Sequence, residues 1–142
     1  MNIIKNKLDL YKYYLGGVVF NCQIIEMDLK VIYALLNSNT KKDIEEFLED
    51  LIMNKSTIGS VVHELIHSGL FNKKDSQTLY DIKKIRNYWC HEGVIQFAYE
   101  KNNFNRNFEE SFAKLEEEHE YLTKLQSSIE KYKLNFYGKK FG

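Results

Sequence analysis

Two histidines and a glutamate in the segment HELIH could hold and use a metal ion. His63 and His67 are four residues apart, so on a helix they share one face, and Glu64 could act as a general base. This is the spacing found in zinc peptidases. A catalytic zinc ion needs a third protein ligand, and the segment LFNKKD from position 70 supplies none at a matching spacing. A helix with its polar side in solvent is therefore favoured, and we expect no metal or other cofactor.

A second segment, RNYWCH, carries groups suited to cleaving RNA without a metal. Arg86 has a permanently charged guanidinium that can stabilise a phosphate, and His91 can move a proton near neutral pH. Asn87 lies one helical turn before His91 and can orient its imidazole, whereas Arg86 and His91 are about 140° apart around an ideal helix. One histidine cannot easily act as both base and acid, so two chains would have to share the site. In the structural alternative, Tyr88 and Trp89 pack in the core and the charged residues simply lie on the surface.

The composition limits the classes of protein that the chain can belong to. Twenty basic and twenty acidic residues among 142 give a formal net charge of zero, which argues against binding nucleic acid through bulk charge. Cys22 and Cys90 are the only cysteines and predict no disulfide framework, in keeping with a reduced, cytoplasmic setting. No apolar run approaches the roughly 18 to 20 residues of a membrane span, and charged residues interrupt the first segment too often for a signal peptide. We expect no membrane partner.

Apolar residues recur every three or four positions along most of the chain, which predicts an all-α protein. The sequence contains no proline that would interrupt long helices. We expect helices over residues 3–15, 19–36 and 41–53, a short helix ending at 67, a longer one from about 74, and a last helix after a loop at 102–107. Gly16-Gly17 should kink or separate the first two helices, and residues 135–142 should form a loose tail. The pattern predicts one domain over residues 1–142, a single bundle of about five helices.

Two helix faces can be assigned in advance. The helix over 19–36 should bury a broad apolar stripe made of Phe20, Ile24, Ile25, Met27, Leu29, Val31, Ile32, Ala34, Leu35 and Leu36. The last helix should bury its own apolar residues and turn an acidic face, Glu116 to Glu118 with Glu120, to solvent.

The chain resembles the HEPN domains, a helical family of toxin–antitoxin, abortive-infection and CRISPR-associated ribonucleases. The family signature is Arg, four to six residues, then His, often with Asn directly after the Arg, and it matches Arg86, Asn87 and His91. The helix YLGGVVFNCQIIEMDLKVIYALL resembles the family's opening helix with its Gln and Glu, here Gln23 and Glu26. The segment KSTIGSVVHELIHSGLF resembles the short helix that precedes the signature helix. These segments occur in the order expected for the family, and together the likeness covers residues 15–97. The resemblance implies that the zinc-like spacing of His63 and His67 is a coincidence.

The resemblance implies a HEPN-like homodimer that cleaves RNA at a composite site of Arg86, His91 and Asn87, with Gln23 and Glu26 in support. Such an endoribonuclease would serve as a bacterial toxin or in abortive phage defence, and an antitoxin or regulatory protein is a further expected partner. The tyrosine that several HEPN toxins carry two residues after the histidine is replaced by a glycine here, which argues against control by adenylylation. Not every HEPN domain is catalytic, so the alternative is a helical interaction or regulatory module that does not cleave RNA. A zinc hydrolase ranks last.

Overall fold

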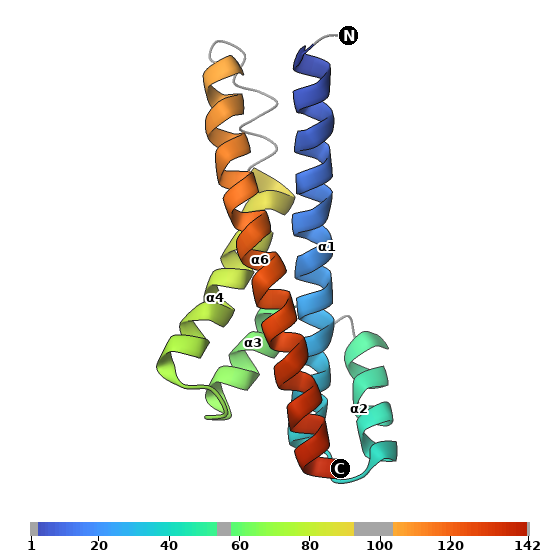
Figure 1. Cartoon of the computed structure of the whole chain (residues 1–142). Coiled ribbons are helices and arrows are strands. Elements are labelled where there is room, and N and C mark those ends of the chain that lie inside the picture. The colour runs from blue at the N-terminus through green and yellow to red at the C-terminus, as the bar shows by residue number, and fades with distance from the viewer. Residues whose placement is uncertain (1–2, 54–57, 93–103, 142) are drawn as a thin grey trace.

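A computed structural model describes residues 3–53, 58–92 and 104–141, and the side chains of residues 8–53, 59–90 and 109–141. Within these ranges the chain is helical apart from short connections, which confirms the predicted all-α bundle (Figure 1). The elements are α1 (Ile3–Asn37), α2 (Lys41–Met53), α3 (Ile58–His67), α4 (Lys73–Asn87), the π-helical turn η1 (Tyr88–Glu92) and α6 (Phe104–Phe141). No helix in the described part is long and apolar enough to cross a membrane.

The two longest helices, α1 and α6, lie side by side and run in the same direction from the N-terminal end of the molecule to its other end (Figure 1). Polar contacts join them at three heights: the hydroxyls of Tyr11 and Ser111 (2.9 Å), the Asn21 amide and the Thr123 hydroxyl (3.1 Å), and the Lys133 ammonium and the Asp28 carboxylate (2.8 Å). The pairs are offset by 100 to 105 positions in sequence, so the two helices keep nearly the same register throughout.

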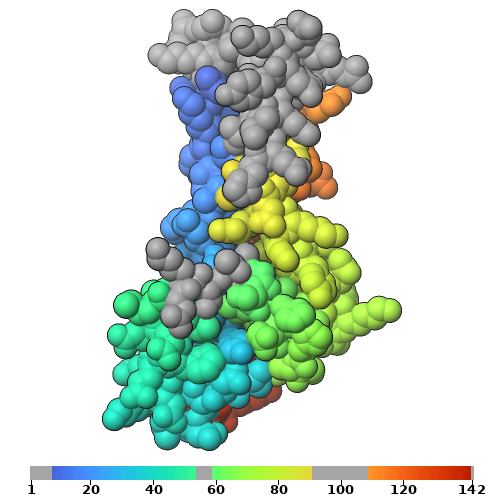
Figure 2. Space-filling model, turned by 180° about the vertical axis from the view of Figure 1, so that it is seen from behind, coloured from blue at the N-terminus to red at the C-terminus, as the bar shows by residue number. Residues whose placement is uncertain are grey.

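Helices α3 and α4 pack against one side of the α1–α6 pair and enclose the main core. Seen from behind, α2, α3 and α4 cover the lower half of the molecule (Figure 2). The large, fully buried side chains of this core come from five elements and include Ile25, Leu29 and Ile32 of α1, Leu65 of α3, Ile82 of α4, Trp89 of η1, and Leu115 and Leu122 of α6. The opposite side of the molecule, which faces the viewer in Figure 1, is formed largely by α1 and α6 themselves.

The predicted stripe on α1 is only partly right, because α1 is apolar around more of its circumference than its neighbours cover. Ile25, Leu29 and Ile32 are buried as expected, but Phe20 is 61% exposed and Met27 is 40% exposed. A helix presents only the face toward its partners to the core, and here that face lies toward α3, α4 and α6.

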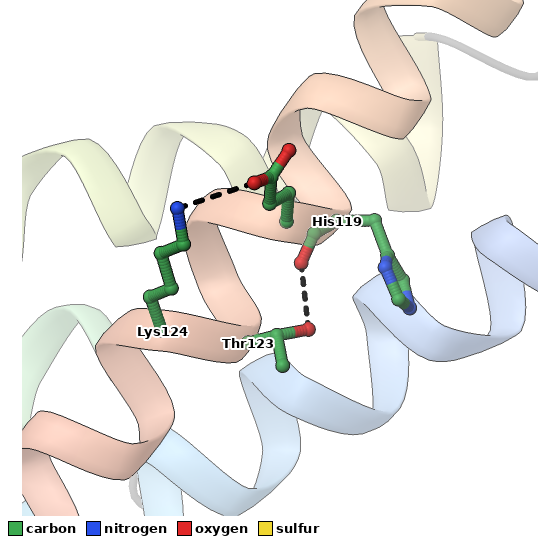
Figure 3. A network of polar contacts seen from close by, with 4 residues as sticks. His119, Thr123 and Lys124 are labelled. Carbon is green, nitrogen blue, oxygen red and sulfur yellow. Dashed lines mark hydrogen bonds and ion pairs between the residues drawn. The ribbon is translucent and has the colours of Figure 1, made fainter.

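Helix α1 is continuous through Gly16-Gly17, so the predicted break at this point is wrong. Glycine lowers helix stability but does not end a helix that tertiary contacts hold. At Gly17 the missing side chain lets α6 approach, since a Cβ there would overlap the imidazole of His119, which points at α1 (Figure 3). At Gly16 a Cβ would meet nothing within 4 Å.

The C-terminal end of α6 packs against α1 and α2, which corrects the prediction of a loose tail over 135–142. Helix α6 continues to Phe141, and Phe136 and Phe141 pack on a second apolar cluster built from Ala34, Leu35 and Ile44. The Lys140 ammonium also donates a hydrogen bond to the Leu35 carbonyl. Two aromatic side chains that find an apolar partner outweigh the polar composition of the segment.

The helix ends follow the local sequence. Thr40 caps α2 by accepting a hydrogen bond from the Asp43 amide (3.1 Å), and Asn72 caps α4 by accepting one from the Asp75 amide (2.7 Å). Gly69, at φ +75°, ends the turn after α3, as glycine does at many helix C-termini. The predicted loop over 102–107 is wrong from residue 104, where α6 begins.

Candidate functional site

The segment that carries the predicted signature does not continue as a regular α-helix. After Asn87 the chain widens into the π-helical turn η1, Tyr88–Glu92, which contains position 91. A π-helix bonds residue i to i+5 rather than to i+4 and has roughly four to five residues per turn. The backbone therefore still places position 91 about one turn after Asn87. The side chain of His91 lies outside the described residues, so its predicted role stays a prediction.

Trp89 holds the π-helical turn against the core. Its side chain is 1% exposed, packs edge-on to Tyr11 (6.5 Å between ring centroids), and donates a hydrogen bond from its indole nitrogen to the Glu118 carboxylate of α6. The core position that was expected of Trp89 is confirmed. The acidic face predicted on α6 is wrong at Glu118, which is half-buried, because a buried indole N–H needs an acceptor.

Arg86 lies near α1. It is half-buried at the end of α4, and its charge acts on the thiol of Cys22, as do the charges of Glu26 and Glu118. Burial raises the pKa of Cys22 to about 12, an effect larger than the lowering by Arg86. The Cys22 thiol is therefore protonated at neutral pH and offers no nucleophile.

Asn87 points elsewhere, into a groove of about 400 Å³ between α4, η1 and α6. We call this the α4–α6 groove; it is lined by Lys84, Ile85, Asn87, Tyr88, Lys114 and Glu118. The Lys114 ammonium stands over the Tyr88 ring, 3.6 Å from its centroid, in a cation–π contact. Arg86 is not among the lining residues, so the groove contains Asn87 without Arg86.

The two supporting residues expected on α1 differ in their exposure to solvent. Glu26 is half-buried, lies within electrostatic reach of Cys22, and forms an ion pair with Lys30 at 3.5 Å. Gln23 is exposed to solvent. Arg86 and Glu26 therefore both act on Cys22, whereas Asn87 lines the α4–α6 groove, and the composite site with His91 stays a prediction.

His63 and His67 lie on the exposed side of α3, with their ring centroids 4.2 Å apart. Glu64 is exposed as well, and with His67 it lines a pocket of about 240 Å³ at the C-terminal end of α1, beside Tyr33 and Asn37. Among the residues that the structure describes, no group of three or more His, Cys, Asp or Glu side chains could hold a metal ion.

Sequence reasoning missed the part that α6 plays in the groove. Lys114 and Glu118 are about 30 positions beyond Tyr88 and Trp89, and the acidic run in which Glu118 stands contains several equivalent candidates. The one available signal was that a buried tryptophan needs a hydrogen-bond acceptor, which calls for a polar partner but does not identify it.

Comparison with known proteins places the chain near a regulatory protein. It is 28% identical over 78 residues to proteins named regulatory protein RecX from strains of Bacillus cereus. The match covers 54% of this chain but 29% of the length of those proteins. No protein-family model matches the chain, and no solved structure matches it significantly.

These findings correct the main functional prediction. The similarity is to a protein named for regulation, which contradicts the endoribonuclease and favours the alternative of a regulatory module.

Proposed function

We propose that the chain is a non-catalytic, helical regulatory module that acts by binding another protein. The similarity to regulatory protein RecX carries the proposal. The Cys22 thiol, which lies within reach of the charges of Arg86 and Glu26, is buried and protonated, so it supplies no thiol chemistry at neutral pH.

The α4–α6 groove is the surface that we propose for this partner. Two ammonium groups, Lys84 and Lys114, flank the Asn87 amide, and the Glu118 carboxylate is engaged by Trp89. Cations beside an amide and the Tyr88 ring suit an acidic segment that carries an aromatic or apolar residue. The groove lies between the continuous helix α6 and η1, which Trp89 bonds to α6, so we expect binding without a large rearrangement.

Three sequence expectations continue as parts of this proposal. A HEPN-like arrangement of the helices, without the cleavage activity, remains our suggestion for the ancestry of the fold. A homodimer and a cytoplasmic regulatory partner also remain proposals. RNA, which the ribonuclease hypothesis required as a substrate, is not among the partners that we propose.

The test is quantitative capture of proteins from a lysate of the source organism on the immobilised full chain. We expect a protein enriched by the wild type to be lost with Lys84→Glu and with Asn87→Glu, because both substitutions place an acid in the groove. Lys42→Glu, at an exposed position on α2, makes the same charge change away from the groove and should retain the protein. Equal capture by all four proteins would contradict the proposed surface.

A second measurement addresses catalysis. Purified wild type and His91→Ala, incubated with total RNA, should leave the RNA equally intact. Cleavage by the wild type that His91→Ala abolishes would contradict the non-catalytic proposal, whatever the capture experiment shows.

A further inference from the structure

The outer side of the α1–α6 pair carries an apolar stripe that no part of the described chain covers. Tyr13, Phe20 and Met27 follow one another every seven residues on α1 and are 69%, 61% and 40% exposed. The next position in this series, Ala34, is fully buried and belongs to the cluster that α2 completes. Helix α2 therefore covers the lower end of the stripe and leaves its upper part in solvent. Large side chains repeated every seven residues on one helix are typical of a face that packs against another helix.

Gly16 lies within this stripe, and no contact within the described residues accounts for a glycine there. Glycine in the middle of a helix costs about 1 kcal/mol relative to alanine. At Gly17 the close approach of His119 accounts for that cost, but around Gly16 there is open space. An exposed gap one turn before Phe20 is what a large side chain of another molecule would fill.

Helix α6 has a second pattern along its length, and some of its charges, such as Glu118, Lys133 and Lys140, bond to other parts of the chain. Between 109 and 120 it carries six glutamates and one lysine, and between 121 and 141 it carries five lysines and one glutamate. The helix dipole favours such a distribution only in the first and last turns, whereas Glu117 and Lys124 lie near the middle of α6. Both are exposed, and their spacing of seven residues places them on one face.

The two patterns share one centre. Asn21 and Thr123 are hydrogen-bonded and 102 positions apart. Each residue in this part of α1 therefore lies level with the α6 residue about 102 positions later in the sequence. The midpoint between Gly16 and Phe20 therefore lies at nearly the same height as the midpoint between Glu117 and Lys124. Figure 3 shows this height, with His119 toward α1 and Lys124 away from it.

We infer that the outer side of the α1–α6 pair is the contact surface of an antiparallel homodimer. Its two-fold axis passes between Gly16 and Phe20 of α1 and between Glu117 and Lys124 of α6. Such an axis places α1 over α1 and α6 over α6 in opposite directions. Phe20 of each copy then lies above Gly16 of the other, and Glu117 of each copy lies opposite Lys124 of the other. The inference specifies the homodimer named in the proposed function, and it uses a surface distinct from the α4–α6 groove.

The occupant is a second copy because the surface complements itself under that operation. The acidic half of α6 meets a basic half, and the large side chain meets the gap, with no second sequence needed. A parallel two-fold arrangement would instead lay α1 of each copy over α6 of the other, with the acidic halves of both α6 helices at the same end of the dimer.

The test is the oligomeric state of the full chain by sedimentation equilibrium, with helicity followed by circular dichroism. We expect a dimer whose Kd rises at least about tenfold with Phe20→Glu, since a central aromatic contact is lost and two like charges face each other. Helicity should be unchanged, because Phe20 is already 61% exposed. Tyr80→Glu, at another exposed aromatic on α4, is the matched control and should leave the Kd unchanged.

The direction of the helices is tested by reversing charges. Glu117→Lys and Lys124→Glu should each weaken the dimer, because each places like charges opposite one another twice. The double variant restores opposite charges and should recover a Kd close to that of the wild type. Glu49→Lys on α2 controls for the change in net charge and should have no effect.

Two outcomes overturn the inference: a chain that stays monomeric at all concentrations, or a dimer that Phe20→Glu does not weaken. A double variant no tighter than the single variants overturns the antiparallel direction and the register with it. Capture of a protein partner through the α4–α6 groove is measured separately, so either proposal can fail without the other.

Discussion

At the scale of single residues, the bond between Trp89 and Glu118 matters most for the position of the candidate groove. It joins η1 to α6 across the core and leaves Tyr88 beside Lys114 in the α4–α6 groove. Removing the acceptor leaves a buried N–H without a partner. Glu118→Ala should therefore lower the free energy of unfolding by about 1–3 kcal/mol in urea denaturation. Glu117→Ala, at the exposed neighbouring position, should change it by less than about 0.5 kcal/mol.

The two cysteines provide a second prediction at this scale. Cys90 is exposed, whereas Cys22 is buried and its pKa is raised to about 12 from the usual value of 9.0. At pH 9 a thiol reagent should modify one cysteine in the folded protein and two in urea. The unfolded state loses the Cys22 proton first, so this group should lower stability as pH rises from about 9 toward 12. Rapid modification of both thiols in the folded protein would contradict the buried position of Cys22.

At the scale of the elements, substitutions at the adjacent glycines of α1 distinguish the effect of intrinsic helix propensity on stability from the effect of packing. Gly17→Ala should destabilise the chain, because its methyl group would overlap the His119 imidazole. Gly16→Ala should stabilise the helix of the monomer by up to about 1 kcal/mol. Thermal unfolding of the two variants at concentrations below the dimer Kd measures both effects. Destabilisation by both substitutions to the same extent would mean that the approach of α6 is not the reason for Gly17.

The end of α6 gives another prediction for an element. Phe136 packs on the cluster shared with α2, so Phe136→Ala should cost about 1.5–3 kcal/mol and speed hydrogen exchange in α2 more than in α3. Asn135→Ala, at the exposed preceding position, should change neither. Uniform exchange across both helices would argue against a separate cluster at this end.

The success of prediction differs between these elements for physical reasons. The ends of α2 and α3 could be predicted because Thr40 and Gly69 act through backbone atoms a few residues away. The continuity of α1 and the ordered end of α6 could not, because they depend on His119 and on Ala34, which are distant in sequence. The surroundings of the signature could not be predicted for the same reason: local spacing does not show that α6 packs on η1 and forms a groove that contains Asn87 but not Arg86.

At the scale of the whole molecule, a net charge of zero conceals a strong separation of charge along α6. If opposite halves of two copies attract each other, the attraction is screened by salt, because the charges involved are exposed. The dimer Kd should therefore rise as NaCl increases from about 0.05 to 0.5 M, over which the Debye length falls to a few ångströms. Sedimentation equilibrium at several salt concentrations measures this slope.

The single variant Glu117→Lys, which has like charges in contact, should show the opposite slope, since salt then screens a repulsion. The double variant with Lys124→Glu should regain the slope of the wild type. A dimer whose Kd is independent of salt in all three proteins would mean that the apolar stripe alone holds it together, and that the charge separation along α6 serves some other contact.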